Sequence, residues 1–172
     1  MTPSGEIKDL NKSAYHLLRR AWQFAGDLYA QEVGAEGLTH RQFTVLLAVD
    51  QNEGASQTDL VSITGIDRST LADLVSRLIK RGYLQRRRTK EDARANSIKL
   101  TAAGRRSLKS AQPGALSADK KLLKVLPTDQ RKEFVTALMK ISDALEEAEE
   151  EIMSNGAFHG NGPTPKRRRG KD

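Results

Sequence analysis

The 172-residue sequence predicts a mainly α fold with a small β wing. An apolar stripe at helical spacing defines one central helix: Leu71, Leu74, Val75 and Leu78. A shorter helix precedes it across a turn at Gly65, and two strand-like segments, residues 83–85 and 96–100, follow Gly82. Two short helices joined by a glycine turn and followed by a hairpin are typical of a winged helix-turn-helix domain. With amphipathic segments on both sides, we expect about six helices and a helical dimerisation domain.

Length and composition limit the class of protein. A chain of this size, 37% hydrophobic and 30% charged, suits one helical domain with tails. It has no cysteine, which excludes disulfides, thiolate metal sites and cysteine nucleophiles. No apolar run approaches the roughly 18 residues that cross a bilayer, and the first ten residues lack a signal pattern. We therefore expect a cytoplasmic protein with no membrane partner.

Positive charge is concentrated in the middle of the chain. Residues 67–109 hold thirteen Lys or Arg against four Asp or Glu, a local balance of +9, whereas residues 143–151 hold six acidic and no basic residues. Charged residues often only solvate a surface. Here the excess lies on a helix and hairpin, which favours a nucleic-acid partner.

Side chains with capping chemistry mark the expected helix starts. Asp67 precedes the central helix, Thr39 a second helix, and Thr101 a fifth. Ser56 and Asp59 have the form of a capping box that opens a short helix over residues 60–64. Pro113 and Gly114 fall inside the fifth helix, where we expect a kink or break because proline removes a backbone donor.

Two apolar seams at heptad-like spacing lie near the ends of the chain. The first runs along a helix over residues 9–32, and the second along a last helix opened by Pro127 and Thr128. Each could pack on its own chain, but two such seams favour a homodimer. The first seam is Leu10, Ala14, Leu17, Ala21, Phe24 and Leu28; the second is Phe134, Leu138, Ile141, Leu145, Ala148 and Ile152.

These patterns divide the chain into four segments. Residues 1–36 form an N-terminal dimerisation helix, 37–102 the winged helix-turn-helix domain, and 103–153 the C-terminal dimerisation helices. Residues 154–172 have a composition that predicts a disordered basic tail. The KRRRGK sequence of that tail fits either a nucleic-acid-binding arm or a solubilising end.

The order of these elements, over residues of about 10 to 152, resembles the MarR family of bacterial transcription regulators. The most specific features are the DRSTL helix start, the RLIKRGYL helix exit, Asp92 and Arg94 in the wing, and the Leu-Thr-x-x-Gly at residues 100–104. The resemblance implies a homodimer that binds a pseudo-palindromic operator in double-stranded DNA and usually represses. It also implies that small ligands, often aromatic carboxylates, bind between the two domains and release the DNA.

The expected DNA-binding residues follow the elements of the winged domain. Arg68 could pair with guanine, and Ser69 or Thr70 could contact phosphate or a base edge. Asp73 could accept from a cytosine or hold Arg77 one turn later, and the second is preferred. Successive side chains at Arg86, Arg87 and Arg88 alternate between the two faces of the wing, so not all three can reach DNA. We expect Arg94 to insert into the minor groove, with Asp92 orienting its guanidinium. The full set is Ser56, Gln57, Arg68, Ser69, Thr70, Arg77, Arg86, Arg88, Lys90, Asp92 and Arg94.

The expected effector site centres on Trp22, the only tryptophan. Aromatic rings with an arginine suit an aromatic carboxylate or an acyl thioester of coenzyme A. The alternative is ordinary core and interface packing, and the histidines are expected to be structural rather than metal ligands. The candidate residues are Arg19, Trp22, Phe24, His40 and Phe43.

Three other functions compete with that of a ligand-responsive regulator, and one of them, a winged helix that serves only protein contacts, fits poorly with the local charge of +9. The chain has no phosphate-cradling glycine loop, His-Glu metal cluster or nucleophile elbow, so we expect no enzyme, catalytic residue or cofactor. A sequence-indifferent architectural DNA-binding protein is the remaining alternative. It would bind random DNA and operator alike, and no metabolite would shift its binding.

Overall fold

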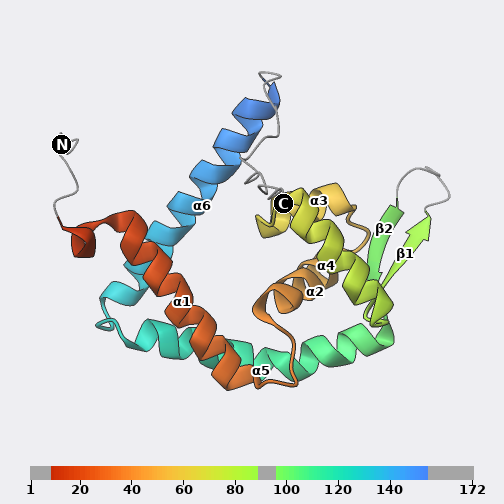
Figure 1. Cartoon of the computed structure of the whole chain (residues 1–172), viewed down its shortest axis with the longest axis horizontal. Helices are drawn as coiled ribbons and strands as arrows, with labels where there is room; N and C mark the ends of the chain where they lie inside the picture. The colour runs from red at the N-terminus through yellow and green to blue at the C-terminus, as the bar shows by residue number, and fades with distance from the viewer. Residues whose placement is uncertain (1–8, 89–95, 155–172) are drawn as a thin grey trace, which may run out of the picture. The chain divides into compact units, whose positions relative to one another are not determined.

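The computed structural model describes residues 9–88 and 96–154, and the chain divides into two compact units, Met1–Thr128 and Asp129–Asp172. In the first unit, a short 3-10 helix, η1 (Leu10–Lys12), is followed by α1 (Ala14–Val33), α2 (His40–Gln51), α3 (Gln57–Thr64) and α4 (Arg68–Lys80). Strands β1 (Leu84–Arg88) and β2 (Asn96–Leu100) then lead into α5 (Ala102–Lys124). The second unit contains α6 (Gln130–Ser154) (Figure 1). The predicted mainly α fold with a small β wing is confirmed.

The first long helix begins later than predicted. The Asp9 side chain accepts a hydrogen bond from the Asn11 backbone N–H at 3.0 Å and therefore caps η1 rather than α1. Ser13 has an extended backbone, and its hydroxyl accepts from the His16 N–H at 3.4 Å, so α1 starts there. Two competing caps four residues apart break the segment that periodicity alone joins.

The predicted caps of the helix-turn-helix are confirmed. Thr39 and Gln42 form a reciprocal capping box at the start of α2, and Ser56 and Asp59 form one at the start of α3. Gly65 ends α3 with a φ of 62°, a left-handed conformation that glycine adopts without strain. α3 is longer than the predicted residues 60–64 because the cap at Ser56 places the first helical residue at position 57.

The core of the first unit lies where α2, α3 and α4 meet the wing and α5. The stripe on α4 is buried as predicted, with Leu74 partly buried. The large side chains with at most 2% exposure are Val45, Leu46, Leu60, Leu71, Val75, Leu78, Leu84 and Ile98. At roughly 1.5–3 kcal/mol for each buried aliphatic side chain, this core accounts for a large part of the stability of the unit.

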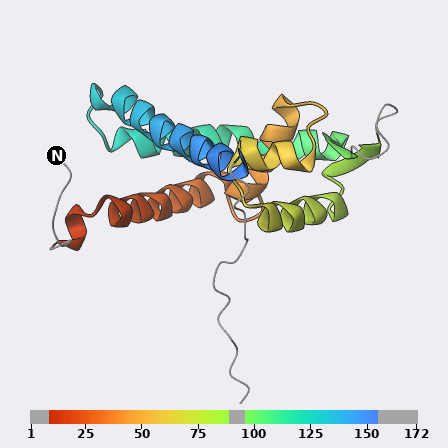
Figure 2. The same ribbon diagram turned by 90° about the horizontal axis from the view of Figure 1, so that it is seen from above.

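The wing is a two-stranded antiparallel sheet beyond the C-terminal end of α4 (Figures 1 and 2). Leu84 lies opposite Leu100, and Arg86 opposite Ile98. β1 runs to Arg88 rather than ending at residue 85 as predicted. Pairing with β2 satisfies the backbone of the arginine run, which intrinsic strand propensity would not indicate.

α5 continues through Pro113 without the predicted break. Its start is confirmed, since the Thr101 hydroxyl accepts from the Gly104 N–H at 3.0 Å. A side chain at Gly114 would place its Cβ 2.7 Å from the Glu32 carbonyl oxygen, so glycine allows α5 to pass close to the end of α1. The packing of α5 on α1 offsets the one backbone hydrogen bond that proline cannot make.

In the second unit, α6 starts at Gln130, so Pro127 and Thr128 precede the helix rather than form its first turn. Of the predicted seam, Phe134 is half-buried, whereas Leu138 and Ile141 are 37% and 59% exposed. The side chains of Leu145, Ala148 and Ile152 lie outside the described residues, as does most of the predicted tail at 154–172.

Candidate nucleic-acid interface and effector pocket

The first turn of α4 presents an exposed, polar surface. The Asp67 carboxylate accepts from the Thr70 N–H at 2.9 Å and from the Ser69 hydroxyl at 2.7 Å. These hydrogen bonds, from Thr70 and then Ser69, hold the pKa of the Asp67 carboxyl well below its usual range. The Ser69 oxygen keeps its lone pairs, so it can still accept a hydrogen bond from a base edge. Arg68 is exposed beside it.

Further along α4, Arg77 is held by an ion pair. Its Nη2 lies 2.7 Å from one Asp73 oxygen, and its Nε donates to the other at 3.2 Å. The preferred reading of Asp73, that it holds Arg77 at i+4, is confirmed. Both side chains are well exposed, so the pair contributes little to stability.

The start of α3 lies beside the base of the wing. The Arg86 Nη2 donates to the Gln57 Oε1 at 3.4 Å, which joins two predicted DNA-binding residues that are far apart in sequence. Ser56, the cap of α3, precedes Gln57. The backbone of Arg88 belongs to β1, but its side chain lies outside the described residues, as do Lys90, Asp92 and Arg94.

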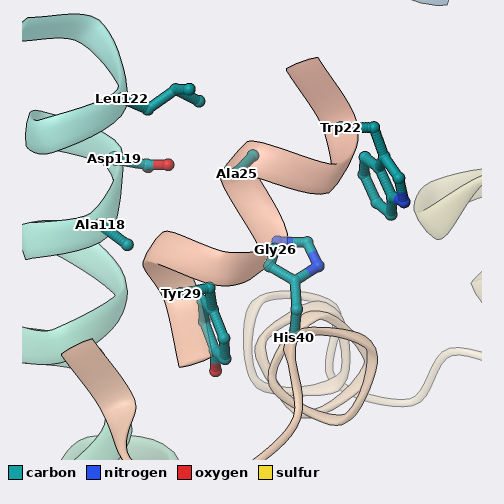
Figure 3. A pocket seen from close by; sticks show the side chains of 8 residues that line it. All are labelled: Trp22, Ala25, Gly26, Tyr29, His40, Ala118, Asp119 and Leu122. Atoms are coloured by element: carbon teal, nitrogen blue, oxygen red, sulfur yellow. The ribbon is translucent and has the colours of Figure 1, made fainter. Parts of the chain in front are cut away.

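Aromatic rings from α1 and α2 surround a cavity of about 110 Å³ (Figure 3). The His40 ring makes edge contacts with Trp22 and Tyr29, at centroid distances of 5.9 and 5.1 Å. Asp119 and Leu122 of α5 close the other side, and Figure 3 shows the Asp119 carboxylate directed toward α1. The cavity is therefore mostly aromatic and apolar, with one acidic group.

Desolvation shifts the pKa of both polar rings. It lowers the pKa of His40, against an opposing effect of the Asp119 charge, although His40 also has a solvent-exposed part. Burial raises the pKa of Tyr29 to about 12. The Tyr29 side chain is buried, and its hydroxyl finds no hydrogen-bond partner among the described residues.

A second, larger cavity of about 420 Å³ shares Trp22 and His40 with the first. Arg41 of α2 lines it together with Asp67, in the turn between α3 and α4, and Thr70, in the first turn of α4. A molecule bound there would contact both the aromatic cluster and the first turn of α4.

Two of the five expected effector residues, Trp22 and His40, line these cavities. The other three expected residues, Arg19, Phe24 and Phe43, line neither cavity. The Phe43 ring packs against the Tyr29 ring, with the two centroids 6.1 Å apart. Sequence reasoning missed Tyr29, although it lies two helical turns after Trp22 on the same face of α1. No local pattern indicated Asp119, which enters from a helix distant in sequence.

The described residues form neither a metal site nor a membrane-spanning helix. Within residues 9–88 and 96–154, no group of three or more His, Asp or Glu residues is placed to bind a metal ion. No helix in those ranges combines the length and apolar character needed to cross a membrane.

A helix-turn-helix followed by a two-stranded wing, with long helices before and after it, defines a winged helix-turn-helix protein. The MarR family model matches residues 36–95. The transcriptional repressor NicR of Pseudomonas putida is 29% identical over 140 residues, which cover 81% of this chain and 89% of NicR. The chain belongs to the MarR family, whose members are transcription regulators rather than enzymes.

Solved structures support the same assignment. BpsR of Bordetella bronchiseptica, whose DNA binding is regulated by 6-hydroxynicotinic acid, is 30% identical with a TM-score of 0.74, over 78% of this chain and 96% of BpsR. The repressor CouR bound to a 23-mer DNA duplex is 29% identical with a TM-score of 0.71, over 80% of this chain and 98% of CouR.

Proposed function

We propose that the chain is a homodimeric repressor that binds a pseudo-palindromic operator and is released by a small aromatic acid or its coenzyme A thioester. The observation that carries the proposal is the exposed first turn of α4, where Asp67 fixes the helix start and leaves Arg68 free to reach a major groove. The CouR complex with DNA supports a DNA partner for this fold.

The DNA contacts divide by position on the winged domain. Arg68, Ser69 and Thr70 read base edges, because the N-terminal residues of a recognition helix lie deepest in the groove. Ser56 and Gln57 contact backbone phosphate at the start of α3. The wing supplies the remaining cations, with Arg94 entering the minor groove beside Asp92. The wing and α4 contacts are Arg77, Arg86, Arg88, Lys90, Asp92 and Arg94.

Dimerisation is proposed from apolar surface that the described residues leave uncovered. On α1, Leu17, Leu18 and Phe24 are 46%, 48% and 43% exposed. On α6, Ile141 is 59% exposed. Several exposed large apolar side chains on one helix are typical of an interaction surface, and a two-fold dimer would place its half-sites about one DNA turn apart.

The effector is proposed to bind in the cavities around Trp22 and His40. Its ring packs against the aromatic cluster. Its anionic group points away from the Asp119 carboxylate, toward Arg41 in the larger cavity, since like charges repel in a partly buried site. In that cavity the ligand would also contact Thr70 at the start of α4, with its anionic group held at Arg41 and away from the Asp67 carboxylate, which gives the ligand a route to DNA release. The regulation of BpsR by 6-hydroxynicotinic acid supports an aromatic acid.

The DNA-reading claim is tested with Arg68→Ala. Duplexes selected from a random library by the wild-type protein serve as the operator, and Lys140→Ala on α6 removes the same charge elsewhere. A bidentate arginine–guanine contact contributes about 1–3 kcal/mol, so Arg68→Ala should weaken operator binding roughly 5- to 150-fold and Lys140→Ala much less. Equal effects of the two variants would refute base reading by Arg68.

A further inference from the structure

Four charged side chains join the base of the wing to the C-terminal end of α2. The Lys99 Nζ on β2 lies 3.1 Å from the Glu53 carboxylate, and the Arg105 Nη1 on α5 lies 2.5 Å from that of Asp50. The four residues line one small cavity together with Val49 and Leu100. We call Asp50, Glu53, Lys99 and Arg105 the wing clasp. Both ion pairs join residues that are distant in sequence: Lys99 and Glu53 are 46 residues apart, and Arg105 and Asp50 are 55 residues apart.

Backbone contacts place the clasp at a joint that is already tightly built. The Ile98 N–H donates to the Ala55 carbonyl at 3.0 Å, which attaches β2 to the segment just before α3. Lys99 and Glu53 flank that hydrogen bond. Just outside the two strands, the Thr101 hydroxyl, which follows β2, donates to the carbonyl of Gly82, which precedes β1, at 2.6 Å. The ion pairs therefore act where β2, α2 and α5 contact one another, beside the backbone hydrogen bond that attaches β2 to Ala55.

Neither stability nor DNA attraction explains the two acidic residues. The Glu53 and Arg105 side chains are 80% and 67% exposed, whereas their partners Lys99 and Asp50 are 29% and 32% exposed, and ion pairs this open to solvent contribute modestly to folding stability. In a domain that binds a polyanion, each carboxylate also reduces the attraction to DNA. Their pairing with Lys99 and Arg105 fits a positioning role better than either of these.

We propose that the wing clasp positions the wing relative to α4, so that Asp50 and Glu53 raise operator specificity although they lower the general attraction to DNA. This rests on the proposed DNA-binding function. It assigns no DNA contact to these four residues; they act through the wing. Two effects of opposite sign should result. Removing the two carboxylates should raise the affinity for random DNA and lower the affinity for the operator.

The test uses the full-length double variant Asp50→Asn/Glu53→Gln. Asp27→Asn/Glu36→Gln removes the same two charges outside the clasp and serves as control. Affinity is measured for the duplex selected by the wild type and for a random duplex of equal length, together with thermal unfolding. We expect the clasp variant to lose roughly three- to tenfold in operator affinity while its random-duplex affinity stays level or rises. The control should gain slightly on both duplexes.

Operator and random affinities that rise together in the clasp variant, as in the control, would overturn the positioning role. So would two unchanged affinities. A wild-type protein that selects no duplex would instead refute the proposed function itself, so the two failures are distinguishable.

A charge swap separates pairing from the loss of charge. Glu53→Lys alone should lower operator specificity, and adding Lys99→Glu should restore most of it, since the pair re-forms with reversed polarity and the net charge returns to that of the wild type. No restoration in the swapped protein, if it unfolds at the wild-type temperature, would show that the Lys99–Glu53 pair does not set the wing position.

Discussion

Replacing Tyr29 by phenylalanine should stabilise the protein. The Tyr29 side chain is only 6% exposed, and its hydroxyl has no hydrogen-bond partner among the described residues. A buried polar group without a partner costs about 1–3 kcal/mol, whereas the ring contacts with His40 and Phe43 survive the substitution. Taking the low end, Tyr29→Phe should gain about 1 kcal/mol, or roughly 3 °C in Tm for a chain of this size.

The assay is urea and thermal unfolding at one fixed protein concentration, because the proposed dimerisation would make Tm depend on concentration. Tyr15, which is 81% exposed, provides the control Tyr15→Phe, expected to change nothing. Burial raises the Tyr29 pKa to about 12, so the folded state keeps a proton that the unfolded state releases above pH 10. The wild type should therefore lose stability relative to Tyr29→Phe as pH rises from 10 toward 12. A destabilised variant would show that the hydroxyl is hydrogen-bonded in solution and would refute the reasoning.

Three further predictions concern the effector pocket and the dimer. Because burial lowers the His40 pKa, the unfolded state gains a proton more readily as pH falls, so the wild type should lose more stability between pH 7 and 5 than His40→Phe; equal losses in urea unfolding would contradict this. Asp119→Asn removes a negative charge facing the pocket and should bind 6-hydroxynicotinate several-fold more tightly in a Trp22 fluorescence titration; an unchanged affinity would place the anion elsewhere. Charged replacements at Leu17 and Ile141 should dissociate the dimer in sedimentation, and a persistent dimer would refute these seams.

The helix starts could be predicted because capping is local chemistry. Thr39, Ser56, Asp67 and Thr101 each satisfy orphan N–H groups within three residues, so their identity and spacing are sufficient. The same logic was ambiguous where Asp9 and Ser13 compete within one turn. The burial of the apolar stripe on α4 could also be predicted, since an amphipathic helix buries its apolar face.

Features that depend on tertiary packing could not be predicted in this way. Pro113 reads as a helix breaker, and only the contact of Gly114 with the end of α1 shows why α5 continues. The arginines at the end of β1 have the composition of a turn, and only their backbone pairing with β2 shows that they extend the strand. Asp119 joins the aromatic cluster from a helix 79 residues after His40, and no short-range pattern signals that approach.

The most direct test of the account is a footprint of the purified protein on the DNA upstream of its own gene, at about 150 mM salt with competitor DNA present. The account predicts a protected, two-fold symmetric site of about 20 base pairs, with half-sites roughly 10 base pairs apart. Diffuse protection that competitor DNA abolishes, together with no preferred site in a genome-wide selection, would contradict a specific operator and favour a sequence-indifferent architectural protein.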